Sequence, residues 1–398
     1  MKLNNITILD CSLRDGGYYN NWDFDEKFVS LYRDKINLLP IDYIEIGYRN
    51  LVHKDYRGKY FYCPLPILNQ WSGIKDKLVL MIDEINTPID QVDKMIKPCI
   101  GKAKMFRIAT KPDRISHGIA LSKKIKQAGF EVGLNIMYLS EWEQYDDFFD
   151  KLKGIEKHID YLYMADSYGA VLPDYIVKMV KKLKSITSVK LGYHGHNNLE
   201  MGLINALKAI EQGVEIIDTS ITGMGRGAGN LRTELLLTYL NSKGYQGITF
   251  GDLSATVALF EDMKRDYGWG TNLPYMFSGT YSLPQKQVME WVGMNRYPIA
   301  SIVNALHNKK SSIDDNLSLP ILENGWKNKN ILIVGGGNSV RENKQALQMF
   351  LQQNKDLKVI HTGLKYFLDF KNIENEQYYA LVGFEGEKLS DAIEGIDL

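Results

Sequence analysis

The chain has 398 residues, which is longer than one typical domain and enough to bury a large core. Its 48 Lys and Arg side chains balance 48 Asp and Glu side chains, so no overall field favours nucleic acid or an anionic membrane. Three cysteines, Cys11, Cys63 and Cys99, include no Cys-x-x-Cys pair, which argues against a disulfide framework or a thiolate zinc site. No apolar run approaches the roughly 20 residues of a membrane span. We expect no signal peptide, a cytoplasmic location, a small-molecule substrate and a homo-oligomer.

Short apolar strands alternate with amphipathic segments from the start to residue 240, a pattern typical of parallel strand–helix units. Eight strands are predicted at residues 6–11, 43–47, 78–82, 105–109, 132–136, 161–165, 190–193 and 216–220. Helical spacing of apolar residues predicts helices at 26–39, 115–128, 175–183 and 201–212. Eight units in residues 1–240 favour a (β/α)8 TIM barrel, with a doubly wound sheet as the competing architecture.

After the barrel the pattern changes twice. Residues 241–320 read as a helical lobe that covers the barrel, with helices expected at 255–267 and 285–292. A polar linker at 320–329 then leads into a small Rossmann-like α/β module at 328–398, with strands beginning at Ile331 and at 358–361 and 379–382. The turn at residues 335–337 lacks the third glycine of a dinucleotide fingerprint, so both a phosphate site and a merely tight turn stay open.

Polar side chains gather where the barrel strands are expected to end. Because barrel active sites lie at the carboxyl ends of the strands, this grouping favours the barrel over an open sheet. The side chains concerned are Asp15, Glu45, Asp83, Arg107, Asn135, Asp166, Ser167, His194 and His196.

Two histidines carry the strongest chemical signal. His194 and His196 stand at i and i+2 near the end of a strand, so their imidazoles project to the same side. Together with the Asp15 carboxylate they predict a site for a divalent cation with vacant positions for substrate. Such ligands suit Mn²⁺, which we expect, or Mg²⁺ or Co²⁺, rather than a closed structural zinc. The same ligand set is found in iron(II) oxygenases, so that class stays open.

A glycine-rich loop at residues 223–230 follows the eighth strand. Asn230, at its end, is a candidate fourth metal ligand or a buttress for the loop. Barrels often bind phosphate at this position, so Arg226 is either a phosphate ligand or a structural support, and we favour the support.

Several segments resemble one known superfamily. They are Ile-Leu-Asp-Cys-Ser-Leu-Arg-Asp-Gly-Gly at 8–17, Tyr-Ile-Glu-Ile-Gly at 43–47, Tyr-Met-Ala-Asp-Ser at 163–167, residues 192–202 and residues 225–230. They look like the DRE-TIM metallolyases, and within these they are most similar to the 4-hydroxy-2-oxovalerate aldolases. The resemblance runs through the barrel and more loosely into the helical lobe.

The resemblance implies a metal-dependent (class II) aldolase that reversibly cleaves a 4-hydroxy-2-oxo acid to pyruvate and an aldehyde. Arg14, Asp15 and Glu45 match the triad that names the superfamily, and Asp15, His194 and His196 match its metal ligands. Ser167 matches a serine that holds the pyruvate carboxylate, and Tyr281 matches a tyrosine on the aldehyde side. We also expect Asn135 and Asp166 to contact the substrate, and Arg14 to donate to its keto oxygen.

The chain departs from these aldolases at one position. They carry a histidine soon after the Arg-Asp pair, which is thought to move the proton of the 4-hydroxyl group, and Tyr18 stands there in this chain. A tyrosine titrates near pH 10 in water. We therefore hypothesise that either Tyr18 or a metal-bound hydroxide moves this proton.

Other members of the superfamily supply the alternatives. An acyl-CoA lyase is expected to carry a cysteine where Met224 stands, and an acetyl-CoA-dependent synthase a different residue at Gly17 and at Asn198. An acyl-CoA-dependent Claisen-type enzyme is the first alternative, and a non-catalytic metal-binding barrel is the second. Aromatic residues expected near the barrel mouth suit a sugar-like aldehyde or lobe packing equally well. They are Tyr18, Tyr19, Trp22, Tyr48, Tyr138 and Tyr168.

Overall fold

The structure is a computed structural model, and it describes residues 6–294, 297–311 and 330–381. The chain divides into two compact units, Met1–Met289 and Glu290–Leu398, with the division inside helix α13 (Gln285–Gly293). The domain limits expected near residues 240 and 320 remain predictions. The linker predicted at 320–329 lies outside the described residues.

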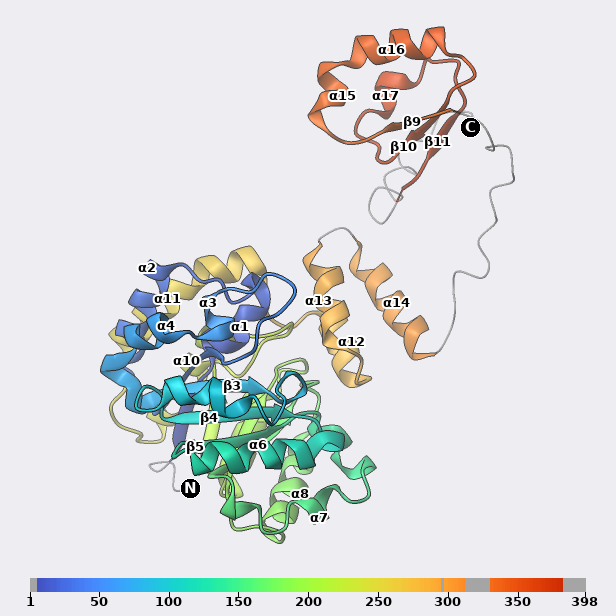
Figure 1. Ribbon diagram of the computed structural model, residues 1–398. Helices are drawn as coiled ribbons and strands as arrows, with labels where there is room; N and C mark the ends of the chain where they lie inside the picture. The colour runs from blue at the N-terminus through green and yellow to red at the C-terminus, as the bar shows by residue number, and fades with distance from the viewer. Residues whose placement is uncertain (1–5, 295–296, 312–329, 382–398) are drawn as a thin grey trace. The chain divides into compact units, whose positions relative to one another are not determined.

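The first unit contains a closed barrel of eight parallel strands in sequential order, surrounded by helices (Figure 1). The strands are β1 (Thr7–Asp10), β2 (Tyr43–Tyr48), β3 (Leu78–Asp83), β4 (Met105–Thr110), β5 (Glu131–Ile136), β6 (Tyr161–Asp166), β7 (Lys190–Gly195) and β8 (Ile216–Thr219). Helices that follow them include α2 (Glu26–Ile36), α6 (Ile115–Gln127), α8 (Pro173–Lys184), α9 (Gly202–Glu211) and α10 (Thr233–Ser242). The barrel prediction is confirmed, and the open doubly wound sheet is excluded.

Helix α1 (Ser12–Asn20) was not predicted, because Gly16 and Gly17 are poor helix formers. The close packing explains both glycines: a Cβ atom on Gly16 would overlap the Met224 side chain, and one on Gly17 would overlap Trp22. The start of α1 is tied to the barrel, since Ser12 N donates to Asp10 Oδ1 at 2.9 Å. These contacts fix where the next turn of α1 presents its side chains.

One layer of the barrel interior is built from the four even-numbered strands. Its members are Glu45 on β2, Arg107 on β4, Tyr163 on β6 and Asp218 on β8, and we call them the even-strand layer. Alternate strands supply such layers because their inward side chains lie at one height. Glycines on the intervening strands leave the necessary room, since a Cβ on Gly133 would lie 3.0 Å from both the Arg107 and the Tyr163 side chains.

Two helices after the barrel also belong to the first unit. Helix α11 (Phe250–Tyr267) packs against α2, with the ring centroids of Phe260 and Phe28 5.1 Å apart. Helix α12 (Leu273–Thr280) lies over the loops that follow β6 and β7, because Gly279 touches the Tyr168 carbonyl and the Asn198 side chain. Within the described ranges, we find no helix that combines the length and the apolar character needed to cross a membrane.

The second unit contains helix α14 (Ile299–Lys310) and a three-stranded parallel sheet in the order β11-β10-β9. The strands are β9 (Ile331–Val334), β10 (Lys358–His361) and β11 (Gln377–Tyr379), and the helices beside them are α15 (Asn338–Glu342), α16 (Lys344–Gln353) and α17 (Phe367–Phe370). Val334, Leu351, Val359 and Phe370 form its core. The additional α/β region that the sequence predicts is therefore present.

Candidate functional site

Asp15, His194 and His196 lie together at the carboxyl end of the barrel. One ligand atom from each lies within 4.8 Å of the other two, and all three residues are buried. His194 lies near the end of β7 and His196 directly follows it, and their ring centroids are 5.1 Å apart. Asp15 comes from α1, with Oδ2 3.8 Å from His194 Nε2. The structure thus brings together the three side chains that the sequence singled out.

The charges around this group favour a bound cation. Burial by itself would raise the pKa of Asp15, but the Arg14 guanidinium, the two imidazoles and the Asn230 amide outweigh it and lower that pKa. Burial lowers the pKa of His196 well below its usual value, so its imidazole is neutral and can offer a lone pair. An ionised carboxylate beside a neutral imidazole is the form in which both residues bind metal.

Arg14 connects this group to the even-strand layer. Its Nε donates to Glu45 Oε2 and its Nη1 to Asp15 Oδ1, both at 2.6 Å. Its Nη2 is buried and has no hydrogen-bond partner among the residues that the structure describes. Buried donors are normally satisfied, so an unpaired one beside a candidate metal group indicates an acceptor supplied by a ligand.

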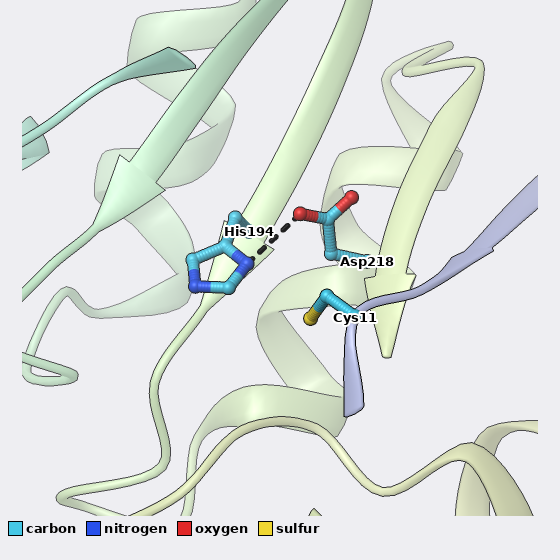
Figure 2. Close-up of side chains that lie close together, drawn as sticks. All are labelled: Cys11, His194 and Asp218. Carbon is cyan, nitrogen blue, oxygen red and sulfur yellow. Dashed lines mark hydrogen bonds and ion pairs between the residues drawn. The ribbon is translucent and has the colours of Figure 1, made fainter. Parts of the chain in front are cut away.

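Asp218 holds His194 in place, a role that the sequence analysis missed. Its Oδ2 lies 2.9 Å from His194 Nδ1 (Figure 2). The same oxygen accepts from Arg107 Nη2 at 2.6 Å. A carboxylate at Nδ1 fixes the tautomer that leaves Nε2 free for a metal. The available signal was a charged residue directly after Ile216 and Ile217, within a predicted barrel strand.

Cys11, His194 and Asp218 form a second group of possible ligands (Figure 2). This group fits a metal less well, because burial raises the pKa of the Cys11 thiol and the thiol donates to the Thr219 carbonyl at 3.3 Å. Asp218 is also already engaged by Arg107. The Asp15 group is therefore the better candidate metal centre.

The glycine-rich loop after β8 closes one side of the site. Asn230 Nδ2 donates to Asp15 Oδ2 at 2.5 Å, so Asn230 holds the carboxylate in place. Its Oδ1 is buried without a partner in the described part of the chain, which keeps a ligand role open. Met224, where a cysteine would mark an acyl-CoA lyase, is buried against Gly16.

The loop after β6 carries two further predicted residues. Ser167 Oγ accepts from the Tyr138 backbone N–H at 3.0 Å, which leaves its own O–H free to donate. Asp166 accepts from the backbone N–H groups of Ala170 and Val171, so its carboxylate shapes the loop. Burial is the main cause that raises the pKa of Asp166 to about 6. Asn135 Oδ1, on β5, accepts from Arg107 Nη2 at 3.2 Å.

Aromatic residues surround the outer part of the site. Tyr18 is 40% exposed, and its hydroxyl lies 3.3 Å from that of Tyr48, whose pKa burial raises well above the usual range. Tyr138 and Tyr168 pair with ring centroids 5.2 Å apart. Tyr281, predicted to lie on the aldehyde side, directly follows α12, is also 40% exposed and packs on Phe277; its place in the site stays a prediction.

Comparison with known proteins decides the family. The family model described as HMGL-like matches residues 85–259. The 4-hydroxy-2-oxovalerate aldolase of Moorella thermoacetica is 30% identical over 262 residues, which cover 63% of this chain and 75% of that protein. The chain belongs to the HMGL-like (DRE-TIM) family. It is a carbon–carbon lyase of the aldolase kind.

Other relatives of this DRE-TIM lyase agree. The aldolase of the same name from Geobacillus thermodenitrificans is 28% identical and aligns with 65% of this chain and 75% of its own. A crystal structure of the N-terminal domain of an aldolase candidate from Bacteroides vulgatus has a TM-score of 0.71 and 46% identity, covering 75% of this chain and 100% of that domain. HMG-CoA lyase from Brucella melitensis, at 13% identity and a TM-score of 0.54, shares the fold. Aldolases of this family depend on a divalent metal ion, for which the buried Asp15 group is the candidate site.

Proposed function

We propose that this lyase is a pyruvate aldolase that reversibly cleaves a 4-hydroxy-2-oxo acid to pyruvate and an aldehyde with the help of a divalent cation, Mn²⁺ being our first choice. The observation that carries the proposal is the unpaired Arg14 Nη2 beside Asp15, His194 and His196. Relatives named 4-hydroxy-2-oxovalerate aldolase support it. Asp15, His194 and His196 are the proposed metal ligands, and Asn230 Oδ1 is a candidate fourth.

A divalent cation fits these residues on charge as well as on ligand type. Asp15, Glu45 and Asp218 face Arg14 and Arg107 within one hydrogen-bonded network, which leaves one formal negative charge uncompensated. The ligand set of one carboxylate and two imidazoles suits Mn²⁺, Co²⁺ or Mg²⁺ with open positions. When bound, the cation would polarise the 2-oxo group of the substrate and make the hydrogens at C3 more acidic.

The chain's own residues then supply positioning and proton transfer. In cleavage, the 4-hydroxyl group loses its proton, the C3–C4 bond breaks, and its electron pair moves onto C3 of the departing pyruvate unit while C4 leaves as the aldehyde carbon. A proton added at C3 completes pyruvate. Arg14 Nη2 is the proposed donor to the 2-oxo oxygen, where negative charge develops. Glu45 is a positioning residue, since it holds Arg14 Nε.

The remaining predicted residues receive roles from their surroundings. The free O–H of Ser167 is suited to donate to the substrate carboxylate, and Asp166 positions it through the loop backbone. Asn135 is proposed to contact substrate from β5, where Arg107 already fixes its amide oxygen. The Tyr18 hydroxyl is the proposed group that exchanges a proton with the 4-hydroxyl of the substrate, and Tyr281 is proposed to line the aldehyde side.

Exchange of the pyruvate methyl hydrogens tests this proposal most directly. The protein loaded with Mn²⁺ should exchange them with deuterium from solvent, a reaction that mass spectrometry of recovered pyruvate records, and chelation should stop it. It should also release pyruvate from 4-hydroxy-2-oxopentanoate. Exchange or release that persists after complete removal of divalent metal contradicts the metal-dependent reaction. A loaded protein that performs neither reaction is a non-catalytic barrel or acts on another substrate class.

A further inference from the structure

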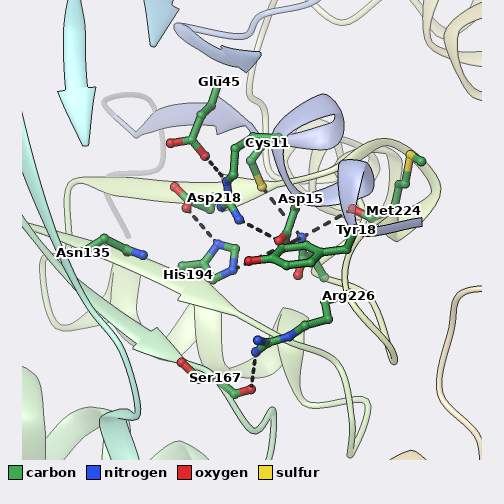
Figure 3. A network of polar contacts seen from close by, with 12 residues as sticks. Cys11, Asp15, Tyr18, Glu45, Asn135, Ser167, His194, Asp218, Met224 and Arg226 are labelled. Atoms are coloured by element: carbon green, nitrogen blue, oxygen red, sulfur yellow. Dashed lines mark hydrogen bonds and ion pairs between the residues drawn. The ribbon is translucent and has the colours of Figure 1, made fainter. Parts of the chain in front are cut away.

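Arg226 lies on the glycine-rich loop between β8 and Asn230, and it is the feature of the barrel mouth that the proposed chemistry leaves unused. The residue is half-buried. Its Nη2 donates to the Ser167 carbonyl at 3.3 Å, and its guanidinium carbon lies 5.8 Å from the centre of the Tyr18 ring (Figure 3). Arg226 therefore stands between two residues that the proposed function places in the active site.

The charge of Arg226 is not balanced locally. Arg14 is paired with Asp15 and Glu45, and Arg107 with Glu45 and Asp218. Across the described ranges, no carboxylate forms an ion pair with Arg226; it donates to a carbonyl, its guanidinium lies near a ring, and its charge also acts on His196 and Tyr168. A guanidinium that is partly withdrawn from water and matched to no anion is suited to bind one from solution.

The loop holds Arg226 in this place. The next residue, Gly227, adopts a φ of 62°, in the left-handed region that favours glycine. Its carbonyl accepts from the Tyr19 hydroxyl at 3.1 Å and from the Gly270 N–H at 3.2 Å. Three residues further on, Asn230 is bonded to Asp15. The arginine is thus presented by a fixed segment, which lowers the entropic cost of binding.

The exposure of the residues around Arg226 indicates which part of the substrate its side chain would contact. The pyruvate unit belongs with the proposed metal ligands and with Arg14, which is only 5% exposed. Tyr18, beside the Arg226 guanidinium, is 40% exposed and so marks the outer part of the site. The aldehyde unit enters from that side.

From this arrangement we infer that Arg226 selects an aldehyde that carries a second anionic group, a carboxylate or a phosphate, at the end remote from its carbonyl. The inference rests on the proposed pyruvate aldolase function and extends it to the class of the second substrate. Arg226 is then a specificity-determining residue: it binds the remote anion while the new C–C bond forms at the aldehyde carbon and the aldehyde oxygen takes up a proton. A neutral sugar-like aldehyde would leave it unused.

Two matched pairs of aldehydes test the inference with the full chain loaded with Mn²⁺. Succinic semialdehyde is compared with butanal, and glyceraldehyde 3-phosphate with glyceraldehyde, each in pyruvate-dependent condensation. We expect kcat/KM for the charged member of at least one pair to exceed that of its neutral partner by about tenfold or more. The pair that shows the preference distinguishes a carboxylate from a phosphate.

Variants then assign the preference to Arg226. Arg226→Gln should bring the charged-to-neutral ratio close to one, mainly through KM for the aldehyde, and Arg226→Lys should keep part of it. Arg232→Gln is the matched control, because Arg232 is exposed and lies a few residues further along the chain. It should leave the ratio unchanged.

Three results would overturn the inference. The wild-type protein could show no preference for either charged aldehyde, or Arg226→Gln could leave an existing preference intact. Arg226→Gln could also slow all four aldehydes equally while raising KM for pyruvate, which would assign Arg226 to the pyruvate carboxylate. In each of these cases the wild-type protein still exchanges the pyruvate hydrogens, whereas failure of the proposed function abolishes exchange and condensation together in the wild-type protein.

Discussion

Two sets of charged residues lie next to each other in this barrel and differ in how their charged groups are paired. In the even-strand layer, Arg107 bridges Glu45 and Asp218, and its guanidinium carbon stacks 3.9 Å from the centre of the Tyr163 ring. In the second set, which we call the metal group after its proposed ligand, Asp15, His194 and His196 converge with one ligand atom of each within 4.8 Å of the other two. Within the layer both carboxylates are bonded to the Arg107 guanidinium, whereas the three side chains of the metal group present their ligand atoms to one another.

The difference teaches which residues belong to the reaction and which to the scaffold. Arg14 and Asp218 are the two links, since Arg14 joins Glu45 to Asp15 and Asp218 joins Arg107 to His194. Substitutions in the metal group should therefore abolish activity while the protein stays folded. Substitutions in the layer should mainly lower the free energy of unfolding. Damage to a link should give graded effects on metal affinity.

The largest effect on activity is expected from Asp15→Asn. The substitution keeps the shape but removes the anionic ligand, so affinity for Mn²⁺ should fall by at least about 100-fold and pyruvate exchange by about 1,000-fold. Isothermal titration with Mn²⁺ and the exchange assay measure both. Asp93→Asn is the control, because Asp93 is exposed and pairs with Lys124 at the surface. Unchanged Mn²⁺ affinity in the Asp15 variant would show that the cation binds elsewhere.

The largest effect on stability is expected from Arg107→Met, which fills similar space without charge. Glu45 and Asp218 would then be buried without their shared partner, a change that costs about 3–5 kcal/mol in the free energy of unfolding. Urea denaturation followed by tryptophan fluorescence measures it. Lys178→Met should cost less than about 1 kcal/mol, because its pair with Glu143 is exposed. Equal losses from the two substitutions would contradict the distinction between layer and surface.

The sequence predicted the barrel because each strand is a local apolar run and the strands recur at regular intervals. It also predicted the metal group, because the spacing of His194 and His196 is a local pattern and Asp15 directly follows Arg14. Both predictions depend on features that a few neighbouring residues carry. The structure then adds the distances.

The even-strand layer could not be predicted from the sequence, because its contacts join residues that are far apart along the chain. Arg107 meets Glu45 across 62 positions and Asp218 across 111, and nothing local to any of the three indicates the pairing. The sequence marks Arg107 as a polar residue near a strand end, and it gives no role for Asp218 inside its strand. Helix α1 could not be predicted locally, because its two glycines are required by packing against Met224 and Trp22. Met224 is more than 200 positions away from Gly16.

Tyr18→Phe tests the outer part of the metal group. If the Tyr18 hydroxyl exchanges the proton of the 4-hydroxyl group, its loss should lower the rate of aldol cleavage relative to the rate of pyruvate exchange by about 100-fold. Tyr48→Phe is the matched comparison, since Tyr48 is buried and its hydroxyl contacts Tyr18. A Tyr18 variant with the wild-type ratio and pH profile would leave the proton transfer to a hydroxide on the metal.

The smallest effect is expected at the link between the two regions, in Asp218→Asn. A single oxygen of Asp218 serves both His194 Nδ1 and Arg107 Nη2, so an asparagine oxygen in that place retains both hydrogen bonds and removes only the charge. Mn²⁺ affinity should therefore fall by about tenfold, the lower end of the effect of losing a partner of a metal-bound histidine. Asp218→Ala removes the acceptor as well and should lose about 100-fold, with a larger loss of stability because Arg107 keeps only Glu45 as a charged partner. Isothermal titration of the two variants separates charge from hydrogen bonding, and equal affinities in both would mean that Asp218 supports the layer but does not orient His194.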